Sequence, residues 1–137
     1  MPTTYSDNAE RIFNKILLVL DDLTLTAAQS GKVLFLNAAA GGDITLPALK
    51  AGVNFKIIVG ATAPTTDWTV QSAEGDNISG VLTVNGALVP AIAEDQMNFV
   101  ASTAVAGDYI ELECDGLGWY VKGTGSAAGS ITATDPS

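Results

Sequence analysis

Acidic side chains are the residues of this chain whose types and spacing could support chemistry. The sequence contains no histidine and a single cysteine, Cys114. It therefore lacks the partners of Ser-His-Asp and Cys-His catalysis and the usual ligands of zinc and iron–sulfur sites. Two carboxylates can serve as general acid and base when they face each other across a substrate bond. Three carboxylate pairs remain to be considered: Asp21 with Asp22, Glu94 with Asp95, and Glu111 with Glu113.

The spacing of these pairs does not predict that they face each other. The first two pairs are sequence neighbours, and Glu111 and Glu113 would share one face of a strand. We expect them as solvated carboxylates on outer strand faces and in loops. A calcium ion is the alternative, because Gly75-Asp76-Asn77 and Asp115-Gly116 offer loop oxygens, but the ligand spacing of a known calcium loop is missing. We therefore expect no catalytic residue, no metal and no cofactor.

The stretch 107–123 predicts a β-hairpin. Apolar and polar residues alternate over 109–114 and again over 119–122, which is the two-residue period of a half-buried strand. Between the two runs, Asp115-Gly116 supplies a turn, because glycine adopts positive φ without steric cost. The hairpin should have one apolar face and one polar face.

The alternation also sorts the large side chains. Cys114 and Trp119 fall on the apolar face of the hairpin, and we expect both of them, together with Trp68, in the core. Tyr109 and Tyr120 fall on the outer face. There they could stack on a sugar, pair across the two strands or pack at a subunit contact.

The rest of the chain predicts further short strands and no long helix. Turn signals such as Asn85-Gly86 separate apolar runs at the spacing of a sandwich or barrel. We predict an all-β fold, an antiparallel sandwich or jelly-roll-like barrel with a short N-terminal helix or arm. Recurring Thr-Leu and Ile-Thr pairs are typical of strands, and no repeat of 20–50 residues stands out. The expected strands are 23–26, 32–36, 43–46, 54–59, 68–72, 78–84, 96–101, 109–114 and 119–122.

Both ends of the chain are expected to lie outside the β domain of residues 23–123. Asp7 and Glu10 resemble a capping box, so residues 1–22 predict an arm with a helix near 7–14 and an extended segment over 16–20. Residues 124–137 are small and almost uncharged, which predicts an extended arm lying on a partner. The residues that we expect to contact partners are Ile12, Phe13, Ile16, Leu17, Tyr109, Tyr120 and Ile131.

Composition narrows the choice of partners. Six basic residues against fifteen acidic ones give a formal net charge of -9, which disfavours nucleic acid and anionic membrane surfaces. Hydrophobic residues make up 47% of the chain and charged residues 15%. So few charges indicate that part of the surface is buried against other copies. The start lacks the basic and apolar regions of a secretion signal, and the apolar run 16–20 is far shorter than a membrane span.

The order of these turn and strand patterns resembles a known family. The segments 25–33, 42–48, 52–60, 68–80 and 107–123, the last with a Gly-Asp…Asp-Gly-x-x-Trp-Tyr hairpin, are similar to small virion proteins of tailed bacteriophages, of the head decoration or cement type. The resemblance covers about residues 23–133. Similar hairpins also occur in phage tail and fibre proteins.

The resemblance implies a structural role. It implies a β-rich subunit, made in the host cytoplasm and typically a homotrimer, on the outer surface of the capsid. There it would bridge neighbouring major capsid proteins and stabilise the shell. The expected partners are the major capsid protein and copies of this chain, and not nucleic acid, membrane or a small-molecule substrate. A receptor- or glycan-binding module of a tail or fibre is the alternative, and an enzyme is disfavoured by the missing histidine and metal ligands.

Overall fold

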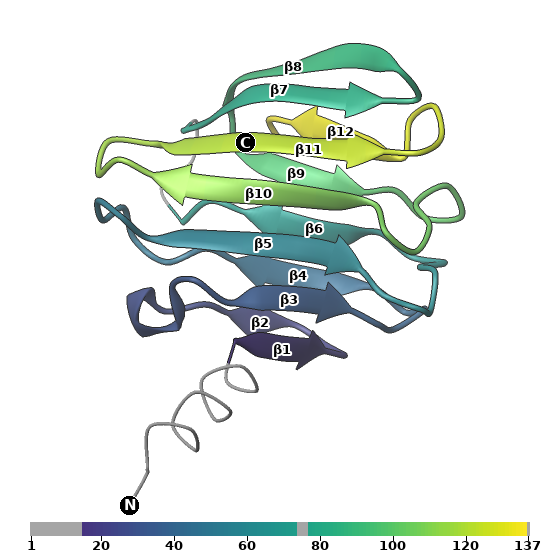
Figure 1. Ribbon diagram of the computed structural model, residues 1–137, viewed down its shortest axis with the longest axis horizontal. Helices are drawn as coiled ribbons and strands as arrows, with labels where there is room; N and C mark the ends of the chain where they lie inside the picture. Colours follow the sequence, from purple (N-terminus) through teal and green to yellow (C-terminus); the bar gives the residue numbers. More distant parts are fainter. Residues whose placement is uncertain (1–14, 74–76, 137) are drawn as a thin grey trace, which may run out of the picture.

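The chain folds as an all-β sandwich of two sheets in the computed structural model, which describes residues 15–73 and 77–136 (Figure 1). The expected all-β class is confirmed. The predicted helix near 7–14 lies outside the described residues, in which a single 3-10 turn, η1 (Ala27–Gln29), is the helical element. The larger sheet has the order β1 (Ile16–Val19), β3 (Val33–Leu36), β5 (Asn54–Val59), β10 (Tyr109–Cys114), β11 (Trp119–Gly125), β7 (Ile78–Val84) and β8 (Ala87–Glu94). The smaller sheet has the order β12 (Ile131–Thr134), β9 (Gln96–Phe99), β6 (Trp68–Gln71), β4 (Gly42–Thr45) and β2 (Leu23–Thr24).

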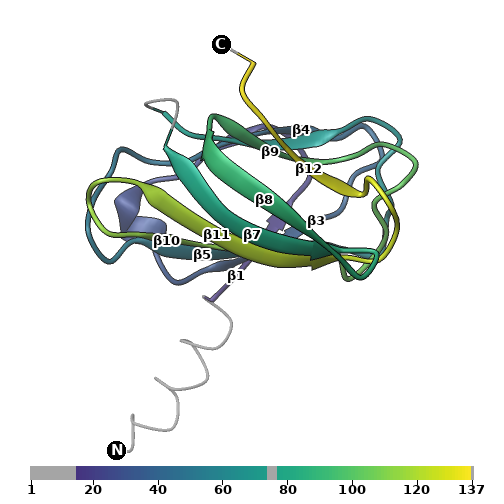
Figure 2. The same ribbon diagram turned by 90° about the horizontal axis from the view of Figure 1, so that it is seen from above.

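The first six strands wind as a coil between the two layers (Figure 2). β1, β3 and β5 enter the seven-stranded sheet in turn, and β2, β4 and β6 enter the five-stranded sheet. Each strand of the coil runs in the same direction as the previous strand of its own sheet. Neighbouring strands within the coil are therefore parallel. Both sheets are therefore mixed, and the expectation of purely antiparallel sheets is corrected.

The coil contains a short repeat of four residues. Asp22-Leu23-Thr24-Leu25 and Asp43-Ile44-Thr45-Leu46 occupy equivalent places, since Leu23 pairs with Ile44 in the parallel register of β2 and β4. The pairs Thr24-Leu25 and Thr45-Leu46 thus mark two successive turns of the coil. Loops of unequal length separate the turns, which is why no regular period stands out.

The second half of the chain supplies hairpins. β10 and β11 pair as predicted, with Cys114 opposite Trp119. Asn85-Gly86 joins β7 to β8 with φ of 52° and 76°, the left-handed pair that a tight two-residue hairpin turn requires. β8, which contains Pro90, is not among the expected strands. Proline is tolerated there because β8 is an edge strand.

The C-terminal segment is part of the sandwich, which corrects the expected arm over 124–137. β11 continues to Gly125, and β12 pairs with β9. A Cβ on Gly125 would overlap the Ser130 hydroxyl, so glycine at this position lets the returning chain pack closely.

The core lies between the two sheets. Trp68 and Trp119 are fully buried, and Cys114 is buried as expected. The Phe55 and Trp119 rings pack with their centroids 6.2 Å apart. A rigid two-layer scaffold of this kind leaves the two outer sheet faces for any contact with other molecules.

Candidate interaction surface

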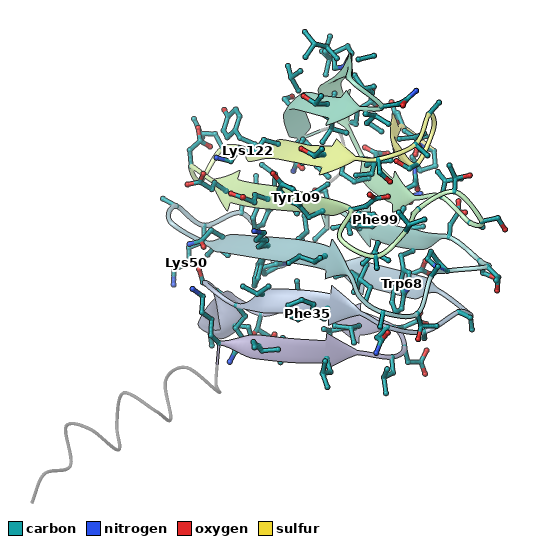
Figure 3. The ribbon with its side chains drawn as sticks, turned by 45° about the vertical axis from the view of Figure 1, so that its right-hand side comes forward. Phe35, Lys50, Trp68, Phe99, Tyr109 and Lys122 are labelled. Atoms are coloured by element: carbon teal, nitrogen blue, oxygen red, sulfur yellow. The ribbon has the colours of Figure 1, made fainter. Side chains whose placement is uncertain are left out.

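The outer face of the seven-stranded sheet carries apolar side chains at its centre. Phe35 of β3, Ile58 of β5 and Tyr109 of β10 lie side by side in register, and Val33 precedes them on β3. All four are half-buried in the free chain. We call these four residues the central patch; Figure 3 labels Phe35 and Tyr109 on this face.

Lysines gather beside the central patch. Lys15, Lys32 and Lys56 line a shallow groove of about 330 Å³, together with Glu111 and Glu113. This cluster sits in a chain of net charge -9, so it sets one end of this face apart electrostatically.

Two side-chain contacts organise this end of the face. The Nζ of Lys56 lies 4.8 Å from the centroid of the Tyr109 ring, a cation–π distance. Lys122 pairs with Glu111 at 3.7 Å, although the pair is largely exposed and contributes little to stability. An apolar area rimmed by charged groups is typical of a protein interface.

The carboxylate pairs do not converge on a common point. Glu111 and Glu113 project from the same side of β10, as predicted, and Glu111 pairs with Lys122. Asp21 accepts a hydrogen bond from the backbone N–H of Asp22 at 2.8 Å, and Asp22 accepts one from the N–H of Asp43 at 2.8 Å. Within the described residues, no group of three or more Cys, Asp and Glu could hold a metal ion.

The Asp115 carboxylate accepts the hydrogen bonds that hold the β10–β11 turn together. Its Oδ1 accepts hydrogen bonds from the N–H groups of Leu117 at 2.8 Å and Gly118 at 3.0 Å, and its Oδ2 accepts one from the Tyr120 hydroxyl at 3.1 Å. The bond from Leu117, above all, holds the pKa of Asp115 below its ordinary value of 3.8. The same carboxylate, through its hydrogen bond and its charge, raises the pKa of Tyr120 above 10.0.

The outer face of the five-stranded sheet is polar and uses its side chains internally. The Thr69 hydroxyl donates to Asp43 at 2.6 Å. The Asn98 amide donates to the hydroxyls of Thr132 at 3.1 Å and Thr134 at 3.0 Å. Two rows, which we call the polar rows, run across this sheet: Asp43, Thr69, Asn98 and Thr132; and Thr24, Thr45, Gln71, Gln96 and Thr134.

Comparison with known proteins identifies no relative of this chain. No protein-family model, curated protein or solved structure matches the chain. In the part of the chain that the structure describes, no helix is long and apolar enough to cross a membrane. Function must therefore be argued from the surface itself.

Three of the residues expected to contact partners point outward. Ile16 on β1 is 47% exposed and Tyr120 on β11 is 51% exposed. Tyr109 belongs to the central patch, but it pairs with Thr124 while Tyr120 pairs with Glu113. The predicted cross-strand tyrosine pair is therefore wrong.

The other expected contact residues lie elsewhere. Leu17 packs against the core from the inner side of β1, and Ile131 is 1% exposed, so its side chain is not available to a partner. Ile12 and Phe13 lie outside the described residues.

Phe35 and Ile58 are not among the expected contact residues, although the sequence indicates that the strand 33–36 is central or lies at a subunit contact. The signal was present at 33–36, where apolar residues occupy both faces of one strand.

Proposed function

We propose that this protein is a structural virion protein that decorates a phage capsid and stabilises it by bridging neighbouring major capsid proteins. The observation that carries the proposal is the central patch. Apolar side chains lie on an outer sheet face, beside a groove lined by three lysines and two glutamates, on a chain of net charge -9. Burying them against a partner removes apolar area from water at about 25 cal/mol per Å².

The shape of this surface favours a macromolecular partner. Small-molecule sites are concave and enclose most of their ligand, whereas the central patch lies on the open face of a sheet (Figure 3). A sheet face held by a packed core offers a preorganised platform, so little conformational entropy is lost on binding. That is the property a subunit needs to hold two neighbouring capsid proteins in place.

The outer face of the five-stranded sheet is suited to face solvent when the seven-stranded sheet faces the capsid. The polar rows hydrogen-bond among themselves, so they present few unsatisfied groups and suit a surface that faces solvent. We place the seven-stranded sheet toward the capsid and the five-stranded sheet away from it, with copies of the chain associating beside one another.

Binding to purified, expanded capsids tests this proposal. The wild-type protein should bind saturably and raise the temperature at which the capsids rupture. Phe35→Asp should lose binding, because a carboxylate in the central patch would be buried without a partner. Thr24→Asp is the matched control, since it adds the same charge at an exposed strand position of the other sheet. Absence of wild-type binding, or equal loss in both variants, would contradict the proposal.

A receptor- or glycan-binding module of a phage tail or fibre is the second candidate. The exposed Tyr120 ring favours it, because sugars stack on aromatic faces. Binding of the wild-type protein to host cells or glycans, abolished by Tyr120→Ala and unaffected by Phe35→Asp, would favour this candidate over capsid decoration.

A further inference from the structure

The seven-stranded sheet ends in two apolar edges. On one edge, Ile16, Leu18 and Leu20 are 47%, 71% and 64% exposed; we call them the β1 edge patch. On the other edge, Val81, Leu88 and Ile92 are 50%, 74% and 76% exposed; we call them the β8 edge patch. Figure 1 places β1 and β8 at opposite ends of the molecule.

The two edge patches lie on the same outer face as the central patch. Leu18 pairs with Phe35 and Ile16 with Val33 in the register of β1 and β3, and Leu88 pairs with Thr83 at the opposite end of that face. Large apolar side chains that are about half exposed or more, and that lie close together, mark an interaction site when they adjoin charged residues. Here the two groups lie at the two ends of the same sheet, so one molecule presents both halves of a possible contact with its neighbours.

Charge and strand direction make the two edges complementary. Through the sheet, β8 runs antiparallel to β1. Lys15 lies at the start of β1, and Glu94 lies at the end of β8. When a second copy is placed beside the first in the same orientation, its Glu94 therefore falls next to Lys15. The far ends of the two strands meet as Asp21 against the neutral turn Asn85-Gly86, so no like charges oppose each other.

Pro90 defines what kind of contact this is. Val84 and Ala87 flank the two-residue turn and form a hydrogen-bonded pair, so Pro90, opposite Val81, occupies a position whose backbone faces away from β7. Proline has no N–H, and β8 therefore cannot offer a complete ladder to another strand. Side chains, and not a continued sheet, must carry the contact.

We propose that the β1 edge patch of one copy packs against the β8 edge patch of the next copy. This is a heterologous contact, in which each molecule uses two different surfaces, and it builds a closed ring when the rotation between copies closes. It rests on the proposed function and deepens it, because the contact between copies would join the outer faces that carry the central patch into one continuous surface toward the capsid.

Sedimentation of the purified full chain tests the contact without any capsid. The wild type should associate, and Leu18→Asp and Ile92→Asp should each break the assembly. Leu117→Asp is the matched control, because Leu117 is 83% exposed in the β10–β11 turn, away from both edges. Leu18→Thr, which keeps a good strand residue, should weaken association in the same direction and guards against misfolding of the aspartate variant.

Mixing the two aspartate variants separates heterologous from isologous contact. Leu18→Asp retains its β8 edge patch, and Ile92→Asp retains its β1 edge patch. An equimolar mixture should therefore form one good contact and stop at a heterodimer, although each variant alone is monomeric. Dimers of either variant alone would show that like patches meet, and would overturn the proposal.

Charge exchange provides the finer test. Lys15→Glu and Glu94→Lys should each weaken association about tenfold at low salt, and the double variant should recover most of the loss. A wild-type chain that is monomeric at all accessible concentrations, or assemblies unaffected by Leu18→Asp, would overturn the proposal. Capsid binding by a monomeric Ile92→Asp variant, which keeps the central patch and the adjoining β1 edge patch, would still support the proposed function, so the two failures are distinguishable.

Discussion

The two outer faces of the sandwich solve the same problem in opposite ways. Both cover one hydrophobic core and both are built from strands whose inner residues are apolar. The five-stranded sheet covers its outside with threonine, asparagine and glutamine, which hydrogen-bond along the polar rows. The seven-stranded sheet leaves apolar groups and lysines outside.

The difference shows which face satisfies its side chains within the molecule and which face needs a partner to cover it. On the five-stranded sheet, side-chain donors find acceptors within the same molecule, so docking of a partner would gain little and would have to displace existing bonds. On the seven-stranded sheet, apolar area remains in contact with water, and only another molecule can cover it. The contrast predicts that changes on the first face affect stability and changes on the second affect association.

The largest expected effect is on the free energy of unfolding, and it comes from the core that both faces cover. Trp119→Ala should lower the free energy of unfolding by about 3–5 kcal/mol, as for other large-to-small core changes. Trp119 is fully buried and its ring packs against Phe55, so the loss comes from packing. Urea unfolding measures it, with Trp119→Phe as a milder control. A loss below about 1 kcal/mol would show that this tryptophan does not support the core.

Breaking the polar rows should have the next largest effect. Asn98 is 6% exposed, donates to two threonine hydroxyls and accepts a hydrogen bond from Gln96. Asn98→Ala leaves these groups unpaired and should destabilise the protein by about 1–3 kcal/mol. Capsid binding measured well below the melting temperature should not change. Weakened binding with unaltered stability would reverse the roles assigned to the two faces.

The central patch should behave in the opposite way. Phe35→Ser should change the free energy of unfolding by about 1 kcal/mol or less, the range of strand propensities on a half-exposed face, while strongly reducing capsid occupancy. Thr69→Val is the counterpart on the other sheet, because it removes the bond to Asp43 without adding charge. If Thr69→Val reduced occupancy as much as Phe35→Ser, the distinction between the faces would fail.

The parts of the fold that the sequence predicts are the local ones. The alternation over 109–114 and 119–122 and the Asp115-Gly116 turn lie within one short stretch, so the hairpin and its buried Trp119 follow directly. The parallel pairing of β1 with β3 depends on a strand in the other sheet between them. No local pattern encodes that crossover, and antiparallel pairing was expected instead.

The remaining errors have equally physical causes. Pro90 opposes strand formation in general and is harmless only on an edge, which sequence alone does not reveal. The C-terminal segment is too small and polar to indicate burial, yet Ser130 donates its backbone N–H to Ala127 and accepts at its carbonyl from Val100. At the candidate surface, Ile16 was identified from its apolar neighbourhood. Phe35 is not among the expected contact residues, because an apolar run on both faces indicates either a central strand or a subunit contact and does not distinguish the two.

The smallest expected effect is a pH response confined to the rim of the seven-stranded sheet. The pKa of Asp115 is lowered from 3.8, chiefly by the N–H of Leu117. A lowered pKa means that the charged carboxylate stabilises the folded turn at pH values above 3.8, and that this contribution is lost as the pH falls through the lower folded value. The amide shifts of Leu117 and Gly118, followed by NMR from about pH 5 to about pH 2, should therefore titrate with a midpoint below 3.8.

Two variants test the cause of that response. Tyr120→Phe removes the hydroxyl that donates to Asp115 but leaves the bond from Leu117, so the midpoint should rise and yet stay below 3.8. Asp115→Asn should abolish the titration at both amides, because the side chain no longer ionises. The Asn98 side-chain amide in the polar rows serves as an internal reference, since its hydroxyl partners do not titrate in this range. A midpoint at or above 3.8 in the wild type would mean that the hydrogen bonds of the turn do not stabilise the charged carboxylate of Asp115.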